Sequence, residues 1–250
     1  MAKNNPKYDK AEFLDSIKLE KFDINQYYGV ETDKNQLYFH FTVSGYGIKG
    51  DMDWWRKDKR KVAACMIIDY DGVPHQLFST RFWAHHLGVS ENIFKKYLDE
   101  KDITKDNKGR IINNLFLNQN SIGIELDTWG PLMEADKKYY PVRWNKELEK
   151  YVPNFRIKPI NKSQVLFLPQ PYRGFRTFEK FSDEQIEKAR QICYYCNEKY
   201  GIPLKFNEKM FEVSKDALNG SPGIWSHSSV RPDKCDIMPQ PEFIQMLKSL

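Results

Sequence analysis

Hydrophobic and polar positions follow a strand-like pattern in the first half of the chain. In residues 35–45, "NQLYFHFTVSG", apolar and polar positions alternate and end in small residues, which predicts a half-buried strand with His40 near its end. Residues 61–78, "KVAACMIIDYDGVPHQLF", predict two strands around a hairpin-type turn at "DYDG". A third apolar run, "IGIEL", predicts a strand that carries Glu125. A carboxylate inside such a run needs an explanation beyond packing.

The second half of the chain is less regular. Residues 131–180 are rich in Pro, Lys, Tyr and Arg and predict a long irregular excursion with at most one or two strands, such as "SQVLFLP". The clearest helix is predicted over residues 182–203, where Ser182 and Gln185 can form a capping box and apolar residues recur at helical spacing until Gly201. The "CYYC" cysteines lie on one face of this helix, which favours core packing over a redox pair.

Strands and helices are interleaved along residues 1–250 without an evident linker. This order predicts an α/β fold in a single domain, with a central mixed β-sheet flanked by helices. Residues 1–34 are expected to form an N-terminal extension, and residues 35–243 the core that contains the excursion. A short closing helix is expected after residue 240.

Composition and charge narrow the class of protein. Hydrophobic residues make up 40% of the chain and aromatic residues 14%, so it can bury a core and is not disordered. The net charge of +5 is spread out, and its densest clusters, residues 56–61 and 101–110, are interpreted as solvated loops. A mildly basic surface would also suit an anionic polymer such as nucleic acid, lipid headgroups or bacterial wall.

The N-terminus and the hydropathy bear on localisation. The first residues, "MAKNNPKYDKAEF", lack the apolar run of a signal peptide, and the chain has no stretch apolar enough to span a bilayer. The chain is therefore expected to be synthesised in the cytoplasm without a membrane span. Its four cysteines are too few for a disulfide framework and are expected to be reduced.

A possible metal site involves residues far apart in the sequence. A catalytic zinc ion needs three protein ligands and an open position for water. His40 after a strand, His227 in a loop, and Cys235 or Asp236 close behind would supply such a set. Two ligands from one loop cost little chain entropy to arrange. Spacing alone does not separate this reading from an ordinary surface loop, whereas a closed structural zinc site, as in a nucleic-acid-binding protein, would need a fourth ligand.

Five segments, taken in order, resemble the successive motifs of the zinc-dependent N-acetylmuramoyl-L-alanine amidases (amidase type 2). This family includes phage lysozyme-type amidases and peptidoglycan recognition proteins. The similarity spans about residues 35–243, and the helix before "YGIP" also resembles a family element. The segments are "FHFTVSG" (39–45), "VAACMIIDYDG" (62–72), "WAHHLG" (83–88), "NSIGIEL" (120–126) and "HSSVRPDKCD" (227–236). The fold that the resemblance implies is peptidoglycan recognition protein-like.

The resemblance implies a set of zinc ligands. His40 matches the first ligand and His227 the second. The third ligand in the family is an aspartate or a cysteine two residues after a lysine, and here Lys234 and Asp236 keep that step. Cys235 instead keeps the count of eight from the histidine that some members have, so it remains the alternative to Asp236, and its thiolate is a ligand that zinc accepts.

The resemblance also implies catalytic and substrate-binding roles. Glu125 matches a glutamate that acts as general base and then acid beside the metal. Lys234 would stabilise the oxyanion that forms when water attacks the amide. His86 matches a histidine at the substrate groove, and Trp83 beside it is either a sugar-contacting or a core aromatic residue. Where some members place a tyrosine and a histidine, this chain has alanine and cysteine, "AC" at 64–65, so the proton transfer would fall to Glu125.

These roles together imply an enzyme with Zn²⁺ as cofactor. It would hydrolyse the amide bond between N-acetylmuramic acid and L-alanine in peptidoglycan, contacting the glycan strand and the stem peptide, as a monomer and without a nucleic-acid partner. A non-catalytic peptidoglycan-binding recognition module is the alternative. The absence of a signal peptide suits a phage or prophage endolysin that reaches the cell wall after release, or a bacterial protein exported by another route.

Overall fold

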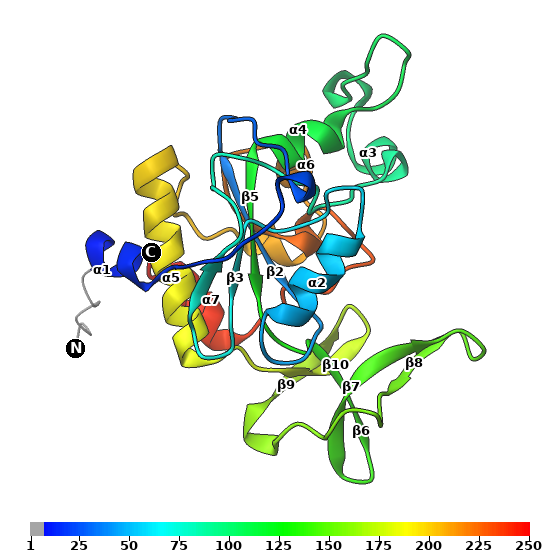
Figure 1. The fold of residues 1–250 in the computed structure, drawn as a ribbon. Helices are drawn as coiled ribbons and strands as arrows, with labels where there is room; N and C mark the ends of the chain where they lie inside the picture. The colour runs from blue at the N-terminus through cyan, green and yellow to red at the C-terminus, as the bar shows by residue number, and fades with distance from the viewer. Residues whose placement is uncertain (1–7) are drawn as a thin grey trace.

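A six-stranded mixed sheet forms the centre of the molecule (Figure 1). The computed structural model describes residues 8–250. Four neighbouring strands run parallel: β3 (Met66–Ile68), β5 (Ser121–Leu126), β2 (Gln36–Phe41) and β11 (Gly223–Ser226). β4 (Pro74–Gln76) is antiparallel to β3, and β1 (Lys18–Leu19) pairs with β4 at the edge. The predicted fold class, a mixed sheet with flanking helices, is confirmed.

The helices surround this sheet (Figure 1). They are α1 (Lys10–Ser16), α2 (Lys49–Lys57), α3 (Glu91–Tyr97), α4 (Asn113–Gln119), α5 (Asp183–Tyr200), α6 (Lys215–Leu218) and α7 (Pro241–Lys248). Short 3₁₀ turns are η1 (Ile24–Gln26), η2 (Glu100–Asp102), η3 (Lys162–Gln164), η4 (Glu208–Phe211) and η5 (His227–Ser229). Within residues 8–250, no helix has the length and apolar composition that a membrane crossing requires.

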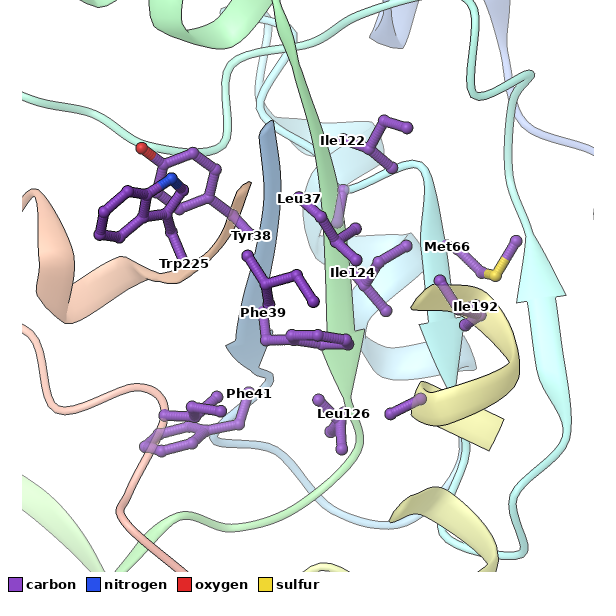
Figure 2. Packing of buried hydrophobic residues seen from close by; sticks show 14 of the residues in the cluster. Leu37, Tyr38, Phe39, Phe41, Met66, Ile122, Ile124, Leu126, Ile192 and Trp225 are labelled. Atoms are coloured by element: carbon purple, nitrogen blue, oxygen red, sulfur yellow. The ribbon is translucent and has the colours of Figure 1, made fainter. Parts of the chain in front are cut away.

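The two faces of the sheet differ in chemistry. On one face, β2 and β5 place side chains such as Phe39 and Ile124 in the main core, where Ile192 of α5 joins them (Figure 2). The ring of Phe39 also lies edge-on to Phe243 of α7, with 5.4 Å between centroids. Since side chains alternate along a strand, the opposite face of β2 carries Gln36, Tyr38 and His40. This second face holds the candidate site.

The strand at 36–41 is more buried than its alternating pattern predicts. All six residues of β2 are buried, because the strand has a neighbour on each side and is covered on both faces. Its polar side chains therefore need internal partners. The Nε2 of Gln36 has them, since it donates to the carbonyl oxygens of Ala217 and Ser221, each at 3.1 Å, whereas the Oε1 of Gln36 has no partner among residues 8–250.

Several other predicted elements are confirmed. β3 and β4 form the hairpin around "DYDG", where Gly72 donates its backbone N–H to the carbonyl of Asp69 at 2.9 Å. α5 begins at the capping box of Ser182 and Gln185 and ends at Gly201, whose φ of 69° is left-handed. The cysteines of "CYYC" are buried and unpaired, as core packing requires, and the closing helix is α7.

The prediction that residues 131–180 are irregular, with at most one or two strands, is wrong. They form a five-stranded antiparallel sheet in the order β8-β7-β6-β10-β9, which projects from the lower part of the molecule in Figure 1. Its strands are β6 (Pro131–Ala135), β7 (Lys138–Asn145), β8 (Lys150–Pro153), β9 (Val165–Tyr172) and β10 (Phe175–Glu179). A small cluster of Leu132, Tyr139, Ile160 and Val165 packs within it, and the anticipated strand "SQVLFLP" corresponds to β9.

Candidate metal centre and active site

Three side chains from distant parts of the chain converge on one point. His40 Nδ1 lies 3.1 Å from His227 Nδ1 and 3.2 Å from Asp236 Oδ2. His227 Nδ1 lies 2.9 Å from the same oxygen. All three residues are buried, and their ligand atoms form a group that could hold a metal ion.

Strand pairing brings these residues together. In the parallel pair of β11 and β2, Ser226 is opposite Phe39, so His227 follows the strand end beside His40. In the pair of β2 and β5, His40 is opposite Glu125. Polar side chains from three neighbouring parallel strands thus meet at the carboxyl edge of the sheet, where α/β proteins commonly bind ligands.

Asp236 reaches the site from the loop that follows η5. Ser228 holds this loop, since its backbone N–H donates to the carbonyl of Asp236 at 2.9 Å and its hydroxyl donates to the same oxygen at 3.1 Å. The alternative ligand, Cys235, is half-buried and does not belong to the convergent group. The loop therefore presents the carboxylate, not the thiol, to the two histidines.

The geometry of this group fits zinc. With Zn–N and Zn–O distances of about 2.0–2.1 Å and tetrahedral angles, two ligand atoms lie about 3.3 Å apart. The three separations of 2.9–3.2 Å are close to this length. The hydrogen bond of His227 is also compatible with zinc binding. Its Nε2 lies 2.8 Å from the carbonyl oxygen of Leu87 and must donate to it, because a carbonyl oxygen only accepts. Its Nδ1 is then free of a proton and can bind a metal.

The charge states suit a divalent cation as well. Burial lowers the pKa of His40 to about 4, so its imidazole is neutral at neutral pH. Burial by itself raises the pKa of Asp236, but the attraction of the neighbouring His227 and His40 rings, when these are protonated, outweighs burial and holds the pKa below its ordinary value. A neutral imidazole and an ionised carboxylate are the protonation states that metal binding requires.

The metal group lies in a cavity of about 600 Å³, a size typical of ligand pockets. Its lining includes the metal group together with His86, Glu125, Lys234, Asp51, Trp54 and Trp55. The carbonyl of Lys234 also lies 3.1 Å from the hydroxyl of Ser228, which shares its one proton between this carbonyl and that of Asp236. The cavity therefore collects acidic, basic and aromatic groups around one possible metal position.

Glu125 has the environment of a proton-transfer group. Its Oε2 is buried and has no hydrogen-bond partner among residues 8–250. Burial raises its pKa well above the ordinary value, and the charges of Asp236 and Asp51 raise it further. A carboxyl group that is easily protonated and lies one strand from His40 can accept and return a proton at the site.

The two residues expected at a substrate groove differ in position. His86 lines the cavity, and its Nδ1 lies 3.0 Å from His40 Nε2. Trp83 is not part of the lining. Its side chain is 7% exposed and stacks on Tyr28 with 3.9 Å between ring centroids. Trp83 is therefore buried beside Tyr28 and outside the cavity lining.

Helix α2 contributes site residues that the sequence did not indicate. Asp51, Trp54 and Trp55 line the cavity, and Trp54 is 58% exposed. Burial raises the pKa of Asp51 to about 6. The adjacent tryptophans of "DMDWW" were a usable signal, but the charge cluster at 56–61 that follows them indicated a solvated loop.

Comparisons with known proteins give only distant similarities. No protein-family model matches the chain, and no curated protein matches it significantly. Among solved structures, PlyL is 12% identical with a TM-score of 0.44, over 93% of this chain and 96% of PlyL. AmpD is 14% identical with a TM-score of 0.43, over 94% of this chain and 93% of AmpD.

The hydrolase AmiA of Staphylococcus aureus, solved in complex with its ligand, is 9% identical with a TM-score of 0.43. That similarity covers 98% of this chain and 84% of AmiA. We draw no conclusion about function from similarities of this size. Function is inferred instead from the residues of the site.

Proposed function

We propose that this chain is a zinc-dependent peptidoglycan amidase that hydrolyses the bond between N-acetylmuramic acid and L-alanine. The observation that carries the proposal is the convergence of His40 Nδ1, His227 Nδ1 and Asp236 Oδ2 in a cavity that also holds Glu125 and Lys234. The five sequence segments that resemble amidase motifs support the choice of bond.

Two histidines and one aspartate would hold the ion and leave a fourth position open, as catalytic zinc sites do. Bound zinc supplies Lewis acidity and lowers the pKa of water toward neutrality. A structural site would be expected to close with a fourth protein ligand. Three ligands at the wall of a large cavity therefore favour catalysis over a structural role.

The remaining roles belong to side chains of this chain. Glu125 would take the proton that the attacking water loses and give it to the leaving nitrogen, because a raised pKa makes its carboxylate a stronger base. Lys234 lines the same cavity, and its ammonium group would stabilise the negative charge that develops on the amide oxygen. The exposed ring of Trp54 offers an apolar surface to a sugar face at the rim.

The proposal is tested with zinc analysis and wall digestion. Purified protein should contain one zinc ion per chain and should release stem peptides with a free L-alanine amino group, identified by mass spectrometry. Glu125→Gln should keep zinc and lose about 100-fold to 10,000-fold in rate. Asp236→Ala should lose zinc, whereas the matched control Cys235→Ser should keep both zinc and activity.

The outcomes separate the amidase from its alternative. A chain that binds zinc and peptidoglycan without releasing stem peptides would be a recognition module of the cell wall. Loss of zinc in Cys235→Ser but not in Asp236→Ala would contradict the ligand set. Full activity of Glu125→Gln would remove its catalytic role.

A further inference from the structure

A chain of hydrogen bonds runs from His40 into the protein interior. Ser121 Oγ lies 2.6 Å from the carbonyl oxygen of Leu117, which only accepts, so the hydroxyl donates to it. Ser121 Oγ then accepts from His86 Nε2 at 2.8 Å, and this nitrogen carries the ring proton. His86 Nδ1 is therefore an acceptor and receives the N–H of His40 Nε2 at 3.0 Å. In consequence His40 Nδ1, which faces the metal group, has no proton.

Leu87, the residue next to His86, fixes the position of the proton on His227, the second metal-binding histidine. The carbonyl of Leu87 accepts from His227 Nε2 at 2.8 Å, which leaves His227 Nδ1 without a proton. The backbone N–H groups of His86 and Leu87 both donate to Asn118 Oδ1, at 2.7 and 3.1 Å. Asn118 is fully buried, and its amide group donates to the carbonyl of Asn114 at 2.6 Å. One fixed dipeptide thus contacts both histidines on the side away from the metal position.

Strand β5 leaves space for the His86 ring at Gly123. Ser121, Gly123 and Glu125 alternate on one face of β5. A Cβ on Gly123 would lie 2.7 Å from His86 Nδ1 and 2.9 Å from its Cγ, closer than packed atoms approach. The missing side chain at Gly123 therefore provides the space in which the His86 ring bridges Ser121 and His40.

We propose that His86 and Leu87, held by Asn118 and Ser121, form a positioning unit that fixes the tautomers of both metal-binding histidines. This assigns His86 a role behind the ligands, which differs from the substrate contact that the sequence resemblance implies. The proposal rests on the proposed metal centre but not on the proposed substrate. The unit makes both Nδ1 lone pairs available to zinc without a proton rearrangement.

The experiment compares Ser121→Ala with Ser121→Thr in the full chain, with zinc alone as the probe. Zinc affinity is measured by competition with a chelating dye, and the ring nitrogens of the zinc-loaded protein are measured by two-bond ¹H–¹⁵N NMR. Ser121→Ala removes the acceptor of His86 Nε2–H, so affinity should fall about 10-fold to 100-fold and the His86 nitrogen shifts should change. Ser121→Thr keeps a hydroxyl, so its zinc affinity and its His86 nitrogen shifts should be those of wild type.

A second pair of variants, His86→Gln and His86→Leu, tests the proposal if Ser121→Ala does not fold. His86→Gln keeps an oxygen that can accept from His40 Nε2–H, whereas His86→Leu does not, so only the leucine variant should lose affinity. Ser182→Ala, a serine variant far from the site, is the control and should bind zinc like wild type.

The proposal is overturned if Ser121→Ala keeps wild-type affinity and unchanged His86 shifts. It is also overturned if alanine and threonine at position 121 weaken zinc equally, because the hydroxyl would then be irrelevant. Zinc binding with an intact His86 signature but without release of stem peptides would refute the proposed substrate alone.

Discussion

Asp127 is a buried carboxylate whose substitution should stabilise the protein at neutral pH. It follows β5 and is fully buried. Its Oδ2 accepts from the backbone N–H of Gly47 at 2.7 Å, and its Oδ1 accepts from the hydroxyl of Thr42 at 3.3 Å. Burial nevertheless raises its pKa from 3.8 to about 7, because the two hydrogen bonds replace only part of the lost hydration.

The direction and size of the stability change in Asp127→Asn follow from the raised pKa of Asp127. A carboxyl group with a raised pKa contributes its full stability below pH 3.8, and this contribution is lost as the pH rises through about 7. At pH 8 the ionised group costs the folded state about 4 kcal/mol as an upper limit, against about 0.5 kcal/mol at pH 4. Asp127→Asn removes the titration, and its amide oxygen can still accept from Gly47. The variant should therefore gain stability over wild type as the pH rises from 4 to 8.

The assay is urea unfolding of metal-free protein at several pH values between 4 and 8. Asp58→Asn is the control with the opposite sign, because hydrogen bonds from Arg60 lower the pKa of Asp58 to about 2. That variant should be less stable than wild type by a nearly constant amount between pH 4 and 8, because the stability that Asp58 contributes is lost only as the pH falls from about 4 toward 2. A difference between Asp127→Asn and wild type that does not depend on pH would refute the reasoning about burial.

Three further substitutions test other parts of the molecule. In Gly123→Ala, the new Cβ would lie 2.7 Å from His86 Nδ1, so the His86 ring should be displaced and zinc binding should weaken in the dye competition assay. Unchanged zinc affinity would contradict the close packing at Gly123. Ser182→Ala removes the cap of α5 and should cost about 1 kcal/mol in urea unfolding, whereas no loss would mean that the cap is redundant. Trp54→Ala should raise the KM for peptidoglycan fragments and leave kcat nearly unchanged, while Trp144→Ala, exposed on the second sheet, should change neither.

The elements that sequence patterns predicted correctly are those with strong local signals. The turn at Asp69–Gly72 forms from its own side-chain and backbone hydrogen bonds. α5 has a capping box at one end and a left-handed glycine at the other. Such signals depend on neighbours within a few residues, so they survive in any tertiary context.

The second sheet was missed because its signals are weak. The hairpin between β6 and β7 turns at Asp136 and Lys137, both with positive φ, where glycine or asparagine would have marked the turn. Along β7, Tyr139 and Pro141 are buried while Trp144 is 51% exposed. Prolines and charged residues within the strands conceal this partial alternation.

Sequence spacing could predict some residues of the site but not others. His40 and Glu125 lie in predicted strands, whereas His227 is predicted in a loop, because strand β11, which pairs with β2, is not among the predicted strands. The choice between Asp236 and Cys235 depends on how one loop turns, and the bonds from Ser228 to the Asp236 carbonyl decide it. Sequence spacing contains no such information.

Strand pairing positions two of the three ligands of the proposed centre. His40 and His227 are fixed by backbone pairing of β2 with β11, and each ring has a hydrogen-bond acceptor behind it. Their ligand atoms already lie at nearly the separations that tetrahedral zinc needs. Zinc binding therefore has little chain entropy to overcome, in contrast to small domains that fold only around their metal. The affinity of the site should accordingly depend on the residues that orient the rings as much as on the ligands themselves.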